Sequence, residues 1–296
     1  MATTKYKSYN AQMRAVKDIA RNQGRLTSST EQDFRYSRFL HRLFADPSSD
    51  FVLKGGMSLL ARIPNARTTR DIDVSVGGDK MLDDGISAMK RAVAVNAGDH
   101  LFFEYAEDAP ITGQGDDALF TGRRLFFDVY GGGLKVDRIQ VDLVAGCEIS
   151  DTPIKYTPLN RIFVPGLEYT DYLLYPIVDQ IADKVSATIQ QYHSGSSSRM
   201  RDLVDLVLIA LNESFSAEKL SAAFASKAFR SQSGTPSKFI IPDTWQSYQR
   251  ALLKFVPNEF KDIDRSVELV SSMLNPILAG ERKSGIWNPE LLEWTD

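Results

Sequence analysis

Two aspartates separated by one residue, Asp71 and Asp73, form the pattern in this sequence with the clearest chemical meaning. The segment from Asp71 to Val76 alternates with a period of two, which predicts a strand with one face in contact with water. Side chains two positions apart on a strand point the same way, so the two carboxylates project together. Such a pair can bridge two divalent cations that activate an attacking hydroxyl and stabilise a leaving pyrophosphate. The pair therefore predicts metal-dependent nucleotidyl transfer.

A third carboxylate on a neighbouring strand would complete this set of ligands. Asp142 is the preferred candidate, because it lies in the alternating segment 139–144 and its neighbours Val141 and Leu143 are expected on the buried face. Asp128 is the alternative for the same role. Carboxylate ligands favour Mg²⁺ or Mn²⁺, whereas three scattered histidines and one cysteine are a poor basis for a four-ligand zinc site.

A glycine pair before a short helix predicts a binding site for the triphosphate of a nucleotide. The apolar segment 51–53 is an expected strand that leads into Gly55 and Gly56, and a helix over residues 57–62 should follow, stopped by Pro64. Glycine allows close approach of the backbone, and the start of a helix offers free N–H groups to an anion. The other candidate phosphate ligands are Ser58, Lys54, Arg67 and Arg70.

Each of these patterns has a simpler explanation when it is taken alone. A Gly-Gly turn more often serves packing, and an Asp-x-Asp pair on a strand is usually solvated surface or a local cap. Their order is more informative. A strand, a Gly-Gly-x-Ser turn, a helix, a gap of about a dozen residues, an Asp-x-Asp strand and a later strand aspartate follow one another, and this combination favours a functional site.

The elements that must position these residues divide the chain into two regions. Residues 1–165 mix helical and β patterns and predict an α/β (α+β) domain with a mixed sheet, preceded by N-terminal helices. One apolar stripe, at positions 36, 39, 40, 43 and 44, has helical spacing and follows a Ser/Thr cap region at residues 28–30. The expected helices span residues 10–22, 31–45 and 83–96, and the expected strands of the β-rich part span 125–130, 134–136 and 139–144.

Residues 166–296 have a helical pattern and predict an all-helical C-terminal domain. Proline at the first expected helix and at the end of the last one supports these boundaries. The expected helices span residues 176–192, 199–212, 217–228, 244–255 and 263–274, the last stopped by Pro276.

The overall composition limits the classes of function. A chain of 296 residues with 43% hydrophobic and 25% charged residues is typical of a soluble globular protein with two domains. No apolar run reaches the length of about 20 residues that a membrane span needs. The polar N-terminus and the single cysteine fit a protein of the reducing cytoplasm. The net charge of -3 argues against a dedicated duplex binder, although an enzyme that holds one nucleotide and an RNA end needs only a local basic face.

The sequence from Leu53 to Leu59 and from Arg67 to Asp73 resembles the AbiEii/MenT-type nucleotidyltransferase toxins, of the polymerase-β-like superfamily. Their signature is hydrophobic-Lys-Gly-Gly-x-(Ser/Thr)-Leu followed by Arg-(Thr/Ser)-(Thr/Ser)-x-Asp-hydrophobic-Asp. Residues 180–187 are similar to the family's helix with an essential lysine, and residues 199–206 to its Arg-x-(Lys/Arg)-Asp-hydrophobic-x-Asp-hydrophobic motif. The resemblance covers roughly residues 50–212 and implies a nucleotidyltransferase-type mixed sheet with flanking helices.

The resemblance also implies roles for charged residues of the C-terminal helices. Lys184 would reach the phosphates of the nucleotide, Asp205 would orient Lys184 or the acceptor end, and Asp202 would belong to the same nucleotide site. Without the resemblance, Lys184 is better explained as part of a solvated helix face. The two aspartates are then an ion-pair row with Arg199 and Arg201.

Thr69 is assigned to the nucleotide site and is a candidate phosphorylation site. In the resembling toxins a Ser or Thr two residues before the first aspartate can be phosphorylated by a partner antitoxin kinase. A phosphate adds about two negative charges, and beside the carboxylates it would compete for the metal ions and the triphosphate site. The simpler explanation is a loop hydroxyl that shapes the entry to the strand.

These expectations describe a cytoplasmic toxin of a toxin–antitoxin or abortive-infection pair. It would transfer nucleotides from a nucleoside triphosphate, by the resemblance a pyrimidine one, to the 3′ end of tRNA and so block translation. Its expected partners are tRNA and a cognate antitoxin, either a kinase or a DNA-binding regulator, and no membrane. The residues alone support only metal-dependent nucleotidyl transfer. Two alternatives stay open: the same transfer to a protein or a small molecule such as an aminoglycoside, and a non-catalytic nucleotide-binding regulatory module.

Overall fold

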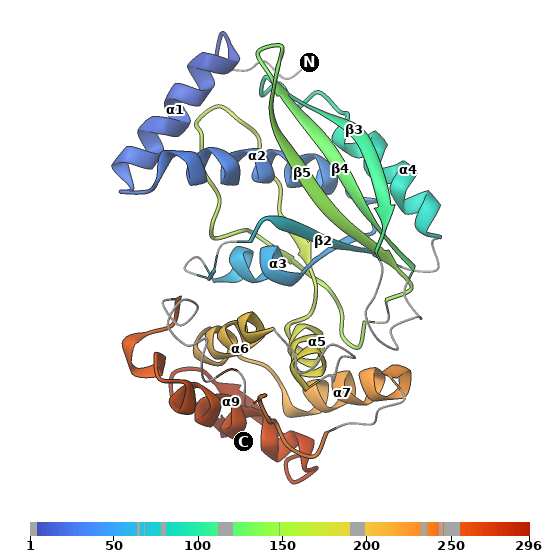
Figure 1. Cartoon of the computed structure of the whole chain (residues 1–296), viewed down its shortest axis with the longest axis vertical. Coiled ribbons are helices and arrows are strands. Elements are labelled where there is room, and N and C mark those ends of the chain that lie inside the picture. The colour runs from blue at the N-terminus through green and yellow to red at the C-terminus, as the bar shows by residue number, and fades with distance from the viewer. Residues whose placement is uncertain are drawn as a thin grey trace.

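A computed structural model describes residues 5–63, 66–67, 69–77, 81–111, 121–147, 149–189, 199–231, 236–242, 245 and 255–296. Its centre is a mixed seven-stranded sheet of order β3-β4-β5-β2-β1-β7-β6. Figure 1 shows the N-terminal helices and the long strands in the upper half of the molecule, and the C-terminal helices as a separate group below β2 and α3. The predicted mixed sheet with flanking helices is therefore confirmed.

The sheet combines a long antiparallel meander with short central strands. β3, β4 and β5 pair antiparallel, β5 pairs parallel with β2, β2 pairs antiparallel with β1, and β1 pairs parallel with β7. The strands are β1 (Phe51–Lys54), β2 (Asp71–Val76), β3 (Leu101–Pro110), β4 (Thr121–Gly131), β5 (Leu134–Ala145), β6 (Ile154–Tyr156) and β7 (Tyr172–Leu174).

The two strands expected over residues 134–136 and 139–144 are in fact one strand, β5. The polar pair between them, Asp137 and Arg138, continues the strand because both side chains find ion partners. Asp137 pairs with Arg35 of α2, and Arg138 pairs with Asp128 across the hairpin. The hairpin turn uses Gly132, whose φ of +61° suits a tight two-residue connection.

The N-terminal helices are α1 (Tyr9–Asn22), α2 (Thr27–Phe44), α3 (Gly55–Arg62) and α4 (Leu82–Val93). The apolar stripe of α2 is buried as its spacing predicts. The expected Ser/Thr cap is wrong, because α2 begins at Thr27 and its N-cap is Leu26. The hydroxyls of Ser29 and Thr30 instead donate to the carbonyl of Leu26 within the first turn.

The C-terminal region is helical as predicted, with the addition of a short antiparallel strand pair. The helix expected to end before Pro276 continues to Leu278. A proline this close to a helix end removes a single hydrogen bond, and its own carbonyl still accepts from the backbone of Glu281 and Arg282. The elements are α5 (Ile177–Ile189), α6 (Met200–Asn212), α7 (Ala217–Ser231), η3 (Asn258–Phe260), α9 (Ile263–Leu278), β8 (Ile286–Asn288) and β9 (Glu293–Thr295). Most of the helix expected over 244–255 lies outside the described residues.

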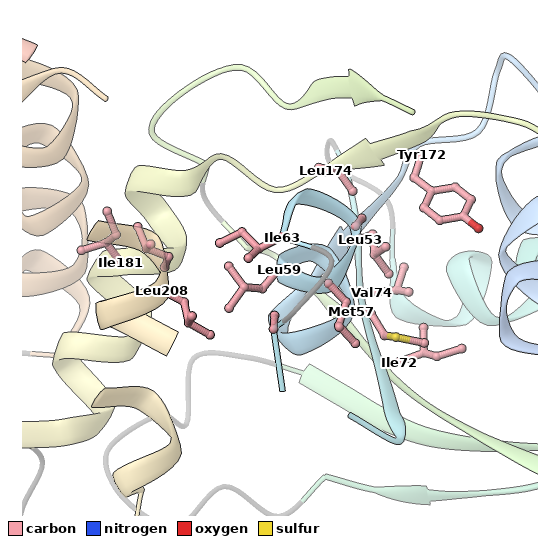
Figure 2. Packing of buried hydrophobic residues seen from close by; sticks show 14 of the residues in the cluster. Leu53, Met57, Leu59, Ile63, Ile72, Val74, Tyr172, Leu174, Ile181 and Leu208 are labelled. Carbon is pink, nitrogen blue, oxygen red and sulfur yellow. The ribbon is translucent and has the colours of Figure 1, made fainter. Parts of the chain in front are cut away.

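One apolar core joins the sheet to the C-terminal helices. Figure 2 shows Leu59 and Ile63 between the sheet strands and the residues Ile181 of α5 and Leu208 of α6. The division into domains after residue 165 stays a prediction, and β7, which follows that position, pairs with β1 in the large sheet. No helix in the described part of the chain combines the length and hydropathy needed to cross a bilayer.

Candidate active site

Four charged side chains lie in register across four neighbouring strands. Lys54 of β1 pairs with Asp73 of β2, Asp73 pairs with Asp142 of β5, and Asp142 pairs with Arg124 of β4. Residues directly opposite each other in a sheet share a face, so these four residues form one row, which we call the charged row. It has two carboxylates in the middle and one cation at each end.

The other predicted carboxylate, Asp71, lies on the same face two residues before Asp73. The side-chain amide of Gln140 donates to Asp71 Oδ1 at 3.0 Å. Asp71, Asp73 and Asp142 are therefore on one face of two adjacent strands, as the spacing predicts. Asp128 lies further along the hairpin, in ion pairs with Lys135 and Arg138, and the structure does not bring it to the charged row.

The pKa of Asp73 is shifted upwards. Burial raises this pKa to about 6, and the negative charge of Asp142 acts in the same direction. Lys54 and Lys184 lower it by smaller amounts. A carboxyl group that is buried beside another carboxylate is stabilised in its ionised form by an added cation.

The donor set fits a divalent metal ion in its chemistry, although it is not arranged for one. Among the described residues, no three His, Cys, Asp or Glu side chains form a group that could hold a metal ion. Two of the three carboxylates have other partners, because Asp142 accepts two hydrogen bonds from Arg124 and Asp71 accepts one from Gln140. The carboxylates are on strands about 4.8 Å apart, so side-chain rotation alone would let them share an ion. A bound cation would offset the repulsion between the carboxylates of Asp73 and Asp142.

Two glycines let the start of α3 lie directly against the sheet. Gly55 has a φ of +62°, and a Cβ atom there would lie 2.0 Å from Oδ2 of Asp73. A Cβ atom on Gly56 would lie 3.0 Å from the side chain of Thr69. The helix begins at Gly55, two residues earlier than expected. Because the first N–H groups of a helix have no partner within it, this turn presents free donors beside Asp73 and Thr69.

Ser58 and Arg70, two further candidate phosphate ligands, differ in burial. Ser58 is fully buried in α3, and its hydroxyl has no hydrogen-bond partner within the described residues. An unpaired buried hydroxyl is unfavourable, so it fits a polar group that arrives with a ligand. Arg70 is exposed, and its carbonyl accepts a hydrogen bond of 2.9 Å from the Tyr36 hydroxyl, which fixes the entry to β2.

Lys54 points towards α5. Its Nζ lies 3.7 Å from Oδ2 of Asp183, 3.4 Å from Sγ of Cys147 and 4.4 Å from the ring centroid of Tyr175. Burial lowers the pKa of Lys54, but the charge of Asp183 and the contact with Cys147 outweigh it, so the pKa is raised. Lys54 is therefore a fixed positive charge at the end of the charged row.

A second cluster surrounds Asp205 in α6. Lys184 Nζ lies 2.5 Å from Oδ2 of Asp205 and 3.2 Å from Oδ1 of Asp202, and Arg67 donates two hydrogen bonds of 2.9 Å to Asp205. Lys184, Asp202 and Asp205 are all buried, so the explanation of Lys184 as a solvated helix face is wrong. The expected pair between Arg199 and Asp202 is present, at 2.8 Å.

The two clusters are joined by α5 and by the loop before β2. The Gln180 side chain donates to the carbonyl of Gly55 at 3.0 Å, which ties α5 to the glycine turn. Arg67 ties α6 to the segment that leads into Asp71. Lys184 is near enough to Asp73 to lower its pKa. The site therefore has acids and free backbone donors on the sheet side and a buried lysine on the helix side.

Several residues at this site were not predicted as ligands or partners. Gln180 and Asp183 lie in the segment that resembles the family's lysine helix, so the resemblance pointed to them without giving a role. Gln140 could have been found from the parallel pairing of β2 with β5. Arg124 could not, because a register shift at Val129/Tyr130 decides which β4 residue faces Asp142.

Comparisons with known proteins identify the family of the chain. A family model described as "Nucleotidyl transferase AbiEii toxin, Type IV TA system" matches residues 38–271. Among solved structures, MenT4, a nucleotidyltransferase toxin from Mycobacterium tuberculosis H37Rv, matches with a TM-score of 0.53 and 16% identity over 88% of this chain and 87% of that one. JHP933 from Helicobacter pylori matches with a TM-score of 0.44 and 13% identity over 85% and 92%. A search of curated proteins found no match.

Proposed function

We propose that this chain, which belongs to the AbiEii family of nucleotidyltransferase toxins, adds nucleotides to the 3′ acceptor end of tRNA. The family is that of type IV toxin–antitoxin systems, so a nucleoside triphosphate substrate and an antitoxin partner follow from membership. A pyrimidine triphosphate is the proposed donor and the cytoplasm the proposed location. Nucleotides added to the acceptor end would prevent aminoacylation and hence translation.

One observation carries the chemistry: Asp73 is paired with Asp142 in the sheet and lies against the N-terminus of α3. Carboxylates can hold metal ions and the N–H groups at a helix N-terminus can bind phosphates, and here the two are adjacent. Asp71, Asp73 and Asp142 would hold Mg²⁺ or Mn²⁺. When bound, the ions would activate the attacking hydroxyl and stabilise the leaving pyrophosphate.

The triphosphate would bind at the glycine turn, beside Asp73 and Thr69. The backbone N–H groups of Gly55 and Gly56 would donate to the phosphates. The Ser58 hydroxyl, which has no partner among the described residues, would donate to a phosphate oxygen that reaches it. Lys54 would add positive charge from the α5 side, and Arg70 is the proposed second cation. Most of these donors are already held in place by the fold, so little reorganisation is needed when the triphosphate binds.

Lys184 would contact the phosphates from the helix side. An ammonium group has three donors, and Asp202 and Asp205 engage two of them among the described residues. The third would donate to a phosphate oxygen of the bound nucleotide. Asp205 would act as a positioning residue, because Arg67 fixes its carboxylate and the carboxylate in turn fixes Lys184.

Thr69 is the proposed point of control. Its side chain packs against Gly56 at the N-terminus of α3, where the triphosphate would bind. A phosphate on this hydroxyl would occupy the same donors and would repel the carboxylate of Asp73 or compete for its ions. This fits an antitoxin that is a kinase, whereas a DNA-binding antitoxin would leave Thr69 unmodified. Mass spectrometry of toxin co-expressed with its antitoxin, followed by a transfer assay, tests the proposal, and full activity of the phosphorylated form would contradict it.

The test of the function is a transfer assay with labelled triphosphates. The purified chain is incubated with Mg²⁺ and each labelled triphosphate, in parallel with total tRNA, total protein and small-molecule acceptors. Label is expected in tRNA at its 3′ end, and label in protein or an aminoglycoside would instead support the alternative acceptors. Asp71→Asn should lose transfer, whereas Asp128→Asn, which removes an acid of the same sheet outside the charged row, should keep it. Toxicity that survives Asp71→Asn would support a non-catalytic module.

A further inference from the structure

Arg124 pairs with Asp142, one of the carboxylates that would hold a metal ion in the proposed function. Its Nε and Nη2 atoms each lie 2.8 Å from one oxygen of Asp142, so both carboxylate oxygens are engaged. A guanidinium and a divalent cation cannot both stand against this carboxylate without repelling each other. Metal binding at Asp142 is therefore favoured when the side chain of Arg124 moves away.

We infer that Arg124 is an internal counterion of the metal site, which a divalent cation displaces from Asp142. The inference rests on the proposed function and adds a positioning residue to it. In the absence of metal, Arg124 holds Asp142 in a fixed orientation and reduces its repulsion with Asp73. It also sets the concentration of free cation at which the site fills, because each ion must compete with the guanidinium.

A comparison with the second bidentate pair of the site shows why Arg124 can move. Arg67 and Asp205 have the same geometry, but their side chains are only 15% and 0% exposed. Arg124 is 42% exposed and Asp142 is 16% exposed. A pair at the solvent edge contributes little net free energy and loses little when the guanidinium turns to water. The pair with Asp205 is locked, and the pair with Asp142 can open.

Lys54, the other cation of the charged row, is not free to be displaced by a metal ion. Lys54 is held by Asp183, Cys147 and the Tyr175 ring on the α5 side, away from solvent. Its charge stays in place whether or not an ion is bound. Arg124 is therefore the cation of the charged row that a metal ion would displace.

The experiment measures Mn²⁺ binding without nucleotide, by electron paramagnetic resonance of the free ion, for four proteins. These are the wild type, Arg124→Gln, Arg123→Gln and Asp73→Asn. Arg123 is a matched control, because it is the adjacent residue of β4, is 39% exposed, and pairs with Asp108 on the other face of the sheet. Arg124→Gln should bind Mn²⁺ about three- to tenfold more tightly than the wild type, and Arg123→Gln should change the affinity less than about twofold.

The result that overturns the inference is an affinity of Arg124→Gln equal to or weaker than that of Arg123→Gln. A general loss of structure would weaken binding, so tighter binding cannot come from damage. If Arg124→Gln does not fold, as judged by circular dichroism, Arg124→Lys replaces it, since lysine keeps the charge but loses the two-point contact. Arg124→Lys should then bind Mn²⁺ more tightly than the wild type, and unchanged binding overturns the inference.

The same data separate this inference from the proposed function. Binding that is equal in the wild type and Arg124→Gln but lost in Asp73→Asn would confirm the metal site and overturn the counterion. Absence of Mn²⁺ binding in all four proteins would overturn both. Mn²⁺ binding that appears only in Arg124→Gln would support both the metal site and the counterion role of Arg124.

Discussion

Two aspartates of this molecule, Asp99 and Asp73, are both largely enclosed by protein and have opposite surroundings. Burial by itself would raise the pKa of Asp99, but hydrogen bonds of 2.5–2.8 Å from Arg42 and Arg38 hold it below its ordinary value. Burial raises the pKa of Asp73 to about 6, and Asp142 contributes in the same direction. The arginines more than offset the cost of burying the charge of Asp99. The lysines near Asp73 do not offset the corresponding cost there.

The difference separates a structural acid from the acid that we propose to be functional. Asp99 anchors α2 to the start of β3, and both of its carboxylate oxygens accept hydrogen bonds from arginines that also donate to backbone carbonyls. Asp73 lies between Asp142 and the glycine turn, where another cation would be favourable. Acids left in such a state cluster at active sites, because the missing charge is brought by a ligand.

The largest effect is expected for Asp73→Asn on nucleotidyl transfer. If Asp73 holds a metal ion as proposed, its loss should reduce the rate on the order of 10²- to 10³-fold or more, because charge stabilisation at the reacting phosphate is lost. The initial rate of label transfer measures this effect, with Asp128→Asn as the control that keeps its activity. A rate within about threefold of the wild type would remove Asp73 from the site.

Asp99→Asn should act on stability instead. The change leaves two buried guanidinium groups without their anion, which typically costs 3–5 kcal/mol, so we expect a loss of about 3–5 kcal/mol in the free energy of unfolding. Urea denaturation measures this loss. The transfer rate per folded molecule should equal that of the wild type. A loss of activity without a loss of stability would show that the two acids do not differ as described.

A pair of glycine substitutions tests the position of Asp73. Gly55 and Gly24 have nearly the same φ, +62° and +63°, but a Cβ atom on Gly24 meets nothing within 4 Å. Gly24→Ala should therefore cost only about 1–2 kcal/mol of backbone strain. Gly55→Ala should show the same strain and also displace the Asp73 carboxylate, with a loss of about a hundredfold in transfer. Equal activity in the two variants would contradict the contact.

The smallest effect concerns the pH dependence of stability without metal. Because the folded-state pKa of Asp73 is raised to about 6 from 3.8, the folded protein holds more protons than the unfolded chain between these values. This acid therefore lowers stability as the pH rises from about 4 to 6. Asp73→Asn should be more stable than the wild type by about 1 kcal/mol at pH 7, after allowance for its partial exposure, and by less at pH 4. Thermal unfolding at the two pH values measures the difference, and a variant that is equally or less stable at pH 7 would contradict it.

The sequence predicts the parts of the site that depend on local periodicity. The two-residue repeat placed Asp71 and Asp73 on one face of a strand, and the buried neighbours of Asp142 gave its direction. The Gly-Gly turn was also predictable, because the positive φ of Gly55 and the contact with Asp73 both require a glycine. Helical spacing likewise identified the buried stripe of α2.

The remaining features depend on contacts between distant segments. The register shift at Val129/Tyr130 brings Arg124 opposite Asp142, and an unshifted hairpin would have placed Arg123 there. Burial of Lys184 depends on its aspartate partners in α6, which periodicity does not reveal. The β8–β9 pair depends on Trp287, whose indole donates to the carbonyl of Ala210 in α6 at 2.8 Å.

The most direct test of the central claim is incorporation of label from each nucleoside triphosphate into the 3′ end of total tRNA, with Mg²⁺ and with a chelator. We predict incorporation from a pyrimidine triphosphate that disappears with the chelator and with Asp73→Asn, and that persists with Asp128→Asn. Incorporation that resists both the chelator and Asp73→Asn would contradict a metal-dependent transfer at the charged row.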